Sequence, residues 1–487
     1  MKCNLLALAF GVSISAAQAA ETILGVYILS RHGDRTDKSH PPTKLTNLGY
    51  SQILASGEYF RNRYVAPLAP QKVFGVASDE VVNSQIHVST TDDAVLLNSA
   101  QAFLQGLYPA VGALSTEILR NGSVVSGVNG GYQLIPIHTM NNGANKEDAT
   151  WLQGTSGCDA AIKSSKAFSD SKEFKALKKE SKEFYQSLEE VWGSTFTSEQ
   201  SDFTNAYAIY DVVNYALIHN QTIPSPELLT DEAFLQLRTL ADKQQWNLAF
   251  NASEPVRAIA GATFAADVLS HLESIVSSKG SKPKVGIQFN AYGTFLSFFG
   301  LAQLPAADAD FYGLPDYGSS MAFELFTNEP VGSFPDAKDI NVRFLFHNGS
   351  TANGGDLTAY PLFGREETEL SWEIFAKEMR AFSVTTTEQW CHTCGNKGGV
   401  CATASNDSHP LAHTTHHGLS APVAGAVGAL VTLVVVLIVQ GLIISIAKLA
   451  IIKKKDIKGK KPESLSSAEP EPVKDEVFDS SPRQWLL

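Results

Sequence analysis

Two arginines and a histidine directly follow an apolar run near the start of the chain. Residues 23–30 (ILGVYILS) predict a buried strand, and Arg31-His32-Gly33-Asp34-Arg35 comes next. A guanidinium group is a permanently charged, planar fork of donors that matches phosphate oxygens. An imidazole between two such cations has a lowered pKa, and its neutral form is a nucleophile. The loop therefore predicts a phosphoryl site with His32 as nucleophile and Arg31 and Arg35 as phosphate ligands.

The segments that follow favour this interpretation over a solvated basic turn, which the tripeptide Arg-His-Gly alone would equally permit. Residues 45–52 (LTNLGYSQ) follow the loop, and further matching segments lie at residues 99–109, 136–139 and 257–261. Together they resemble the histidine acid phosphatase family, in its branch with fungal phytases and acid phosphatases. The resemblance covers most of the chain from Ile23 to about Cys401.

The resemblance implies both a fold and a chemistry. The implied fold is α/β, a mainly parallel central sheet flanked by helices with an inserted α-helical subdomain (the phosphoglycerate mutase-like, or histidine phosphatase, fold). The implied reaction is attack by His32 on a phosphoryl group held by Arg31 and Arg35, followed by hydrolysis of the phosphohistidine. A small phosphorylated substrate would enter between the sheet and the subdomain. No cofactor or metal is expected, because the arginines supply the positive charge.

Two positions depart from the family pattern in ways that would weaken catalysis. The family carries a further phosphate-binding Arg four residues before the Ser-Ala pair at residues 99–100, and this position is Val95. It also carries a His-Asp pair that binds phosphate and protonates the leaving group. Counting back from residues 298–301 places that pair near Gln288-Phe289. His347-Asn348 looks like a damaged copy of the pair but matches the following strand.

The missing acid leaves the proton donor open. A positioned general acid contributes about 10²–10⁴-fold to a rate, so its absence would leave slow turnover or none. Asp34, Asp92, Asp93 and His138 are candidate substitutes. His138 lies in an apolar run, however, and equally fits a hydrogen-bonded core residue. Asp37 also stands where the family usually has Pro.

The rest of the chain supplies the elements that would position this site. Residues 85–89, 285–289 and 341–346 predict strands, and a helix is expected at about 93–105. Such alternation is typical of βα units. Residues 158–253 differ, because they predict helices with little strand signal. We interpret this stretch as the inserted subdomain, with helices expected at residues 172–192, 206–219 and 231–249.

The two ends of the chain predict a membrane-anchored, secreted domain. Residues 1–19 have the pattern of a signal peptide, which leaves a phosphatase-like ectodomain at 20–402. Residues 421–447 form an uncharged apolar block long enough to span a bilayer. The lysines that follow predict a cytoplasmic, disordered tail at 448–487, which argues against a cleaved lipid-anchor signal. Residues 403–420 read as a flexible stalk, although their histidines could bind a metal.

Cysteines, sequons and charge agree with a lumenal or extracellular ectodomain. Four cysteines remain after the signal peptide, and in an oxidising compartment they favour two disulfides over a zinc site. The three possible pairings stay open at this point. The net charge of −12 argues against a nucleic-acid partner. The cysteines are Cys158, Cys391, Cys394 and Cys401, and the glycosylation sequons are at Asn121, Asn220, Asn251, Asn348 and Asn406.

These features favour a membrane-anchored acid phosphatase-like enzyme that hydrolyses phosphomonoesters outside the cytoplasm, at the cell surface or in a vacuolar or other endomembrane lumen. The alternative is a catalytically impaired pseudophosphatase that binds a phosphorylated ligand or a protein partner. A phosphate-transferring sugar mutase fits the broader superfamily but not the signal peptide.

Overall fold

The computed structural model describes residues 21–111, 116–127, 131–140, 157–219, 222–330 and 332–402. All of them belong to the first of two compact units, and the boundary between the units in the sequence falls after Ser408. The predicted signal peptide, stalk, membrane span and tail lie outside the described residues. So do the sequons at Asn220 and Asn406.

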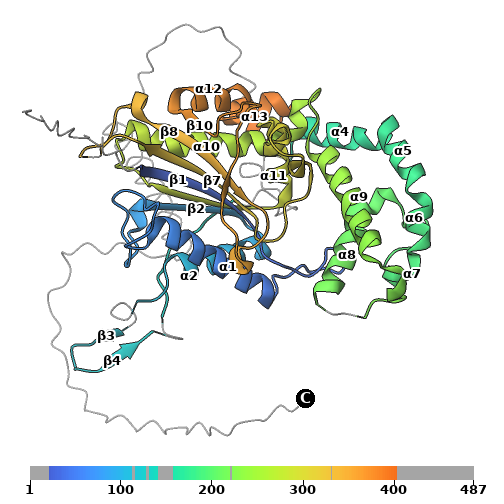
Figure 1. Cartoon of the computed structure of the whole chain (residues 1–487), viewed down its shortest axis with the longest axis horizontal. Helices are drawn as coiled ribbons and strands as arrows, with labels where there is room; N and C mark the ends of the chain where they lie inside the picture. Colours follow the sequence, from blue (N-terminus) through green and yellow to red (C-terminus); the bar gives the residue numbers. More distant parts are fainter. Residues whose placement is uncertain are drawn as a thin grey trace, which may run out of the picture. The chain divides into compact units, whose positions relative to one another are not determined.

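A mixed sheet forms the centre of the described unit (Figure 1). Its strand order is β10-β8-β7-β1-β6-β2-β5, and β9 pairs with β8. Strands β1, β6, β2 and β5 run parallel, whereas β7, β8, β9 and β10 join through antiparallel pairs. The predicted α/β fold is confirmed, with a parallel half and an antiparallel half. The strands are β1 (Thr22–Arg31), β2 (Ile86–Thr91), β5 (His138–Met140), β6 (Val285–Asn290), β7 (Ser320–Thr327), β8 (Asn341–His347), β9 (Thr358–Ala359) and β10 (Glu369–Ser371).

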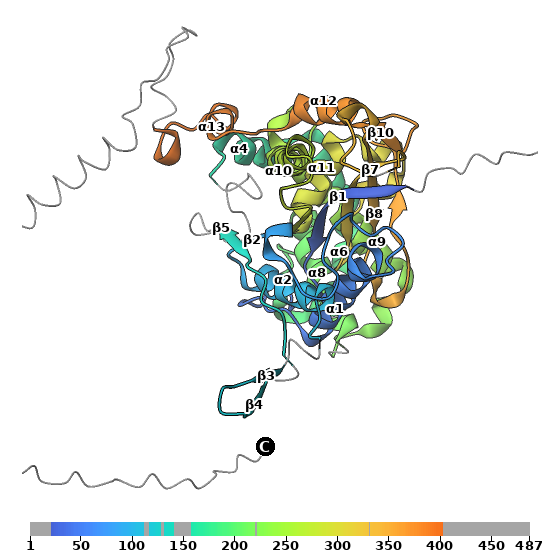
Figure 2. The ribbon, with the colours of Figure 1, turned by 90° about the vertical axis from the view of Figure 1, so that its left-hand side faces the viewer.

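Helices cover both faces of this sheet (Figure 2). On one face α1 (Asn47–Phe60) packs against α2 (Ala94–Leu107), and on the other lie α10 (Ile259–Ser277), α11 (Tyr292–Leu301) and α12 (Trp372–Phe382). The central strand β1 serves both cores. Its Tyr27 and Leu29 join the core beneath α10, and Val26 and Ile28 join the core beneath α1 and α2. A small separate hairpin, β3 (Thr116–Ile118) and β4 (Val124–Ser126), follows α2.

One helix in the described part of the chain, Pro255–Ser277, is long and apolar enough to cross a membrane. It contains α10, and 67% of its apolar window is buried inside the protein. Its side chains pack on β1 and on α11 and α12, so its apolar composition is explained by the core of the sheet domain.

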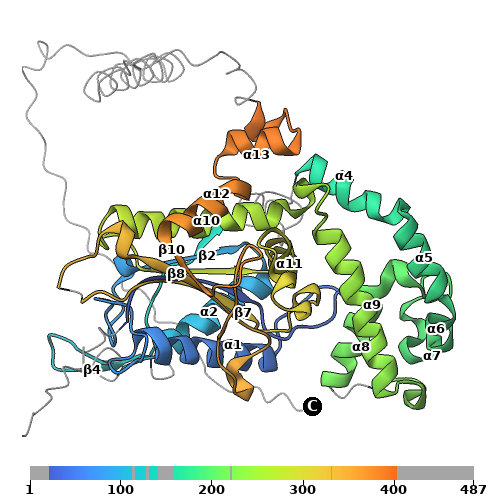
Figure 3. The same cartoon turned by 45° about the horizontal axis from the view of Figure 1, so that its top comes forward.

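The inserted subdomain consists of helices (Figure 3), and no strand occurs in its described residues 157–219 and 222–253. The predicted helix at 172–192 is three shorter helices, interrupted at Ser181 and Leu188. Its helices are α4 (Asp159–Ala167), α5 (Lys172–Glu180), α6 (Lys182–Ser187), α7 (Glu189–Trp192), α8 (Ala206–Ile218) and α9 (Asp231–Ala249).

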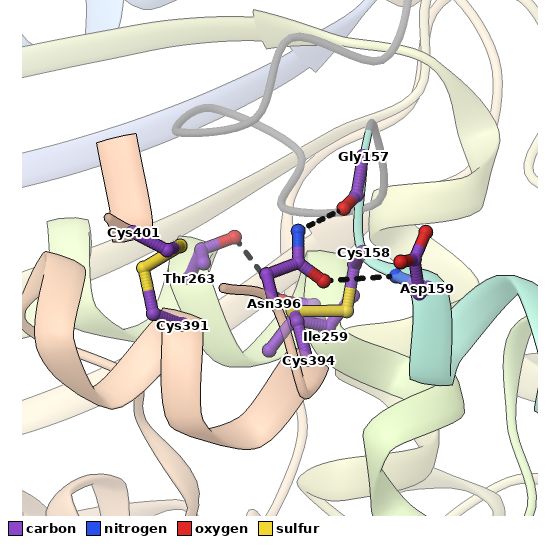
Figure 4. The surroundings of a disulfide bond; sticks show 9 residues. All are labelled: Gly157, Cys158, Asp159, Ile259, Thr263, Cys391, Cys394, Asn396 and Cys401. Carbon is purple, nitrogen blue, oxygen red and sulfur yellow. Dashed lines mark hydrogen bonds between the residues drawn. A yellow bond between two sulfur atoms is a disulfide. The ribbon is translucent and has the colours of Figure 1, made fainter. Parts of the chain in front are cut away.

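Two disulfides involve the four predicted cysteines, and the structure selects one of the three pairings (Figure 4). Cys158 bonds to Cys394, and Cys391 bonds to Cys401. The first links the start of the subdomain to α13 (Thr387–Cys394), across 236 residues of sequence. Asn396 supports the same junction, because its amide donates to the Gly157 carbonyl.

The buried acid Asp267 predicts how stability depends on pH. Its Oδ2 atom on α10 is buried without a partner among the described residues, and burial raises its pKa to about 8. The unfolded chain ionises this group near pH 4, so the folded state holds one more proton between those values and stability falls as pH rises from 4 to 8.

We therefore expect Asp267→Asn to raise the free energy of unfolding at pH 7.5 by about 1–3 kcal/mol relative to wild type, with little change at pH 4. Urea denaturation at both pH values measures this. Asp170→Asn, at an exposed site, is the control and should show no such dependence. An Asp267→Asn effect of equal size at the two pH values would contradict the assignment.

Candidate active site

The three predicted residues lie together at the carboxyl end of β1. Arg31 is the last residue of the strand and pairs with Asn290, the last residue of the parallel strand β6. His32, Arg31 and Arg35 are only 1%, 5% and 0% exposed. Three groups that could each carry charge are therefore concentrated in a protected site at the sheet edge, where α/β proteins bind ligands.

Two glycines determine how the chain turns after β1. A Cβ atom on Gly33 would lie 2.3 Å from the carbonyl oxygen of Gly49, and one on Gly49 would lie 2.0 Å from that of Asp34. No side chain fits at either position. The loop after β1 and the start of α1 therefore touch backbone to backbone, which explains the glycine in each of the two sequence motifs.

The motif at residues 45–52 holds this loop in place. Thr46 caps α1 by accepting from the Gly49 N–H at 3.0 Å, and its hydroxyl donates to the Asp34 carboxylate. Gln52 accepts from the Asp34 N–H at 2.8 Å. Asp34 is thus a structural anchor of the loop, fixed from one side by the first turns of α1.

The surroundings of His32 favour the neutral form of its imidazole. Its Nδ1 lies 2.8 Å from the carbonyl oxygen of Gly33, so Nδ1 carries the proton and donates it. Its Nε2 is buried and has no hydrogen-bond partner in the described chain. Burial lowers the pKa of His32 well below 6.5, and the charges of Arg31, Arg35 and Lys38 lower it further. The lone pair on Nε2 is therefore available.

Arg31 is held by a backbone carbonyl and by aromatic rings. Its guanidinium donates to the carbonyl of Pro315 and lies 4.6 Å from the ring centroid of Tyr317 and 5.4 Å from that of Tyr292. Such cation–π contacts are stronger when the cation is desolvated. The Nε–H of Arg31 is buried and lacks an acceptor among the described residues.

Arg35 is paired within the protein. Its two terminal nitrogens each donate to one carboxylate oxygen of Asp211, both at 3.0 Å, and one also donates to the Tyr207 hydroxyl at 2.9 Å. Asp211 also accepts from the N–H of Lys38 at 2.8 Å. A bidentate carboxylate therefore occupies the donors that a phosphate would use. Only the Nε–H of Arg35 is left without a partner in the described structure.

One face of α8 makes these contacts from the helical subdomain. Tyr207, Asp211, Tyr215 and His219 follow one another at intervals of four, so they share a face of the helix. Tyr207 and Asp211 bind Arg35, and His219 Nε2 lies 2.7 Å from Asp34 Oδ2. The sequence analysis missed this face. Its spacing of polar and aromatic residues within a predicted helix was the available signal.

Tyr317 covers the three predicted residues. Its ring centroid lies 5.6 Å from that of His32 and within 6 Å of both guanidinium carbons, at 4.6 and 5.7 Å. The phenol donates to Asp211 at 3.3 Å. The backbone on either side is fixed, because Gly318 N–H donates to the His32 carbonyl at 3.0 Å and Arg31 N–H to the Ser319 carbonyl at 2.8 Å.

The structure refines the predicted departures from the family pattern. Val95 is 2% exposed in the first turn of α2, one turn before Ser99, whose hydroxyl lies 3.4 Å from the Gly33 N–H. At β6, however, the residues that reach the sheet edge are Asn290 and Ala291 rather than Gln288 and Phe289. Neither Asn290 nor Ala291 is a histidine or an aspartate.

The other residues considered for this role lie elsewhere. Gln288 accepts from Tyr27 inside the sheet, and the Phe289 ring packs on Phe103. Asn348 follows β8 as predicted, and its Oδ1 accepts from the Asp316 N–H at 2.8 Å. His347 ends β8.

Most of the candidate substitute acids are engaged away from His32. Asp93 caps α2 by accepting from the N–H groups of Val95 and Leu96. His138 stacks on His87 at the far edge strand, with ring centroids 4.8 Å apart. Asp34 is tied to α1 and to His219, as described above.

Among the described residues, no group of three or more histidine, cysteine, aspartate or glutamate side chains is arranged to hold a metal. Asn121 and Asn251, two of the described sequon residues, accept hydrogen bonds from Ser123 and Ser253 of their own sequons. Glycosylation at Asn121, Asn251 and Asn348 stays a prediction.

Comparison with known proteins identifies the family. Residues 37–347 match the model of the histidine phosphatase superfamily (branch 2), which is more than half of the chain. The chain therefore belongs to this superfamily, as the sequence motifs predict.

Relatives and solved structures agree with this assignment. The chain is 25% identical to lysosomal acid phosphatase of Xenopus laevis over 353 residues, which cover 69% of this chain and 72% of that protein. It is 24% identical to bovine (Bos taurus) prostatic acid phosphatase over 339 residues, covering 66% and 78%. The fold is similar to that of apo Hafnia alvei phytase, with a TM-score of 0.51, 13% identity and coverage of 78% and 99%.

The geometry predicts that His32 stays neutral in acid. Because its pKa is lowered well below 6.5, its imidazole should keep the nitrogen shifts of the neutral form between pH 7.5 and pH 5. Histidine-selective ¹⁵N NMR of the ectodomain, with His32→Gln used for assignment, measures this. A His32 signal that titrates with a midpoint near 6.5 would show that the imidazole is not held as described.

Proposed function

We propose that this protein is an acid phosphatase-like enzyme that hydrolyses phosphomonoesters through a phosphohistidine at His32. The observation that carries the proposal is the His32 Nε2 atom, buried between two guanidinium groups with its lone pair free in the described structure. The Nε–H donors of Arg31 and Arg35 are buried without acceptors among the described residues as well. An acceptor-rich, negatively charged tetrahedral group complements these atoms.

The proposed reaction has two displacements. The Nε2 lone pair attacks phosphorus while Arg31 and Arg35 stabilise the charge that spreads over the phosphoryl oxygens. Water then attacks the phosphohistidine and releases phosphate. The hydrogen bond from Nδ1 to the Gly33 carbonyl keeps the ring in the required tautomer throughout and stabilises the positive charge that develops on it.

Three features support the alternative, a catalytically impaired member that binds a phosphorylated ligand or a protein partner. Val95 supplies no charge where the family has Arg. Asn290 and Ala291 supply no acid at the sheet edge. Asp211 neutralises Arg35 and competes for its donors. Each loss of a charge-assisted hydrogen bond costs about 1.5–3 kcal/mol of affinity, so phosphate binding should be weaker than in a complete site.

We further propose that the domain acts outside the cytoplasm and is tethered by one membrane span at residues 421–447. The predicted signal peptide, the two disulfides and the five sequons support this, and so do the lysosomal and prostatic acid phosphatases among the relatives. The substrate would be a small phosphorylated molecule, and no nucleic acid is expected to bind the acidic domain.

The central experiment is a rapid-quench reaction of the purified ectodomain with 4-nitrophenyl phosphate at pH 5. We expect a burst of nitrophenolate of up to one equivalent and a phosphorylated peptide that contains His32. His32→Ala should abolish both, because no other nucleophile lies between the two arginines in the described site.

Binding of inorganic phosphate without any labelled peptide would instead support the impaired alternative. A burst followed by turnover too slow to measure would indicate a crippled enzyme. Equal activity in wild type and His32→Ala would contradict the proposal.

Asp211 provides a second prediction. Asp211→Asn removes the charge that competes for Arg35, so inorganic phosphate should bind about tenfold or more tightly. The ligand-free variant should be less stable by about 3–5 kcal/mol, because a buried guanidinium loses its partner. Calorimetric titration and thermal unfolding with and without phosphate measure the two effects.

Asp242→Asn is the matched control, because it breaks the partly buried pair with Arg238 in the same subdomain without touching Arg35. It should leave phosphate affinity unchanged. An Asp211→Asn variant that binds phosphate no better than wild type would show that Asp211 does not compete for the site.

A further inference from the structure

The proposed reaction lacks an assigned proton donor. When an alkyl phosphate is cleaved, the leaving oxygen is a strong base and must receive a proton as the bond to phosphorus breaks. Asn290 and Ala291, at the sheet edge beside Arg31, have no proton to transfer at this step. The donor must be sought among the other groups close to His32.

Tyr317 is the acidic group that packs directly on all three predicted residues. Its ring lies beside His32, Arg31 and Arg35, with separations of 5.6, 4.6 and 5.7 Å. The Tyr317 side chain is partly exposed to solvent, whereas His32 is only 1% exposed.

We propose that Tyr317 is the general acid of this site, and that its phenol O–H protonates the oxygen that leaves when the phosphoryl group moves to His32. This assignment rests on the function proposed above. It places the proton donor on the loop before β7, where the family resemblance implies none.

The protons and electrons balance over the two displacements. In the first, the His32 Nε2 lone pair forms the N–P bond, the P–O bond breaks with its electron pair on the leaving oxygen, and the Tyr317 proton moves to that oxygen. In the second, water attacks phosphorus, the N–P bond breaks, and the proton of the water returns to the Tyr317 phenolate. No further reactant is required.

The neighbours of Tyr317 suit this role. Arg31 and Arg35 stabilise the phenolate that forms, while Asp211, which accepts from the phenol at 3.3 Å, orients the hydroxyl in the resting state. Burial raises the pKa of Tyr317, so the proton is present throughout the acidic range.

The test compares two esters that differ in their need for an acid. Nitrophenolate leaves without a proton, whereas the alkoxide of glycerol 2-phosphate does not. We expect Tyr317→Phe to lower kcat/KM for glycerol 2-phosphate by about 10²-fold or more. For 4-nitrophenyl phosphate kcat/KM should stay within a few-fold of wild type, because the ring that packs on Arg31 is kept. Tyr210→Phe, which removes a subdomain phenol that bonds Arg238, is the control and should affect neither ester.

Each other outcome overturns the assignment. An equal loss on both esters would indicate a structural role, and no loss on glycerol 2-phosphate would exclude proton donation. A wild-type ectodomain that forms phosphohistidine from 4-nitrophenyl phosphate but never cleaves glycerol 2-phosphate would contradict the role of Tyr317 and leave the proposed function standing. Absence of phosphohistidine with both esters would overturn the two proposals together.

Discussion

The hydrogen bond between His32 Nδ1 and the Gly33 carbonyl sets the chemistry of the whole site. It fixes the tautomer that leaves Nε2 unprotonated, and it exists only because the loop turns sharply after β1. That turn depends on the close backbone approach of Gly33 and Gly49. The first turns of α1 therefore shape the proposed catalytic loop, although none of their side chains needs to touch a substrate.

Burial of this loop has an electrostatic cost that the rest of the fold offsets. Taking an unpaired charge out of water costs several kcal/mol, and two guanidiniums lie here at 5% exposure or less. Asp211 balances one of them, while Tyr317, Tyr292 and the Pro315 carbonyl stabilise the other. The helical subdomain thereby stabilises the loop through α8. The same contacts restrict access of a phosphoryl group to Arg35, so stability and ligand binding are in competition.

Local patterns in the sequence predicted the parts of the site that follow one another along the chain. The apolar run before Arg31 marked β1 because its buried side chains serve two cores, and the motif at 45–52 marked the start of α1. Val95, where the resemblance implies an Arg, lies in a helix as predicted. The α/β fold and the four bonded cysteines were likewise predicted, because short-range composition determines them.

Contacts between distant segments were not predictable in the same way. Asp211 lies 176 residues after Arg35 in the sequence, and Tyr317 lies in the loop before β7. No local pattern in the sequence shows that both residues contact Arg35. The antiparallel half of the sheet follows from how β7 and β8 pair, which composition does not specify. The end of β6 at Asn290 was not predicted, because the end of a fully buried strand leaves no mark in an apolar sequence.

The account as a whole depends on whether His32 Nε2 meets phosphorus. A crystal structure of the ectodomain soaked with orthovanadate tests this most directly. We predict a trigonal-bipyramidal vanadate bonded to His32 Nε2, with the Nε–H groups of Arg31 and Arg35 on its equatorial oxygens and the Tyr317 hydroxyl at the apical oxygen opposite. Vanadate bound elsewhere, with His32 still covered and Nε2 without a ligand, would contradict the account.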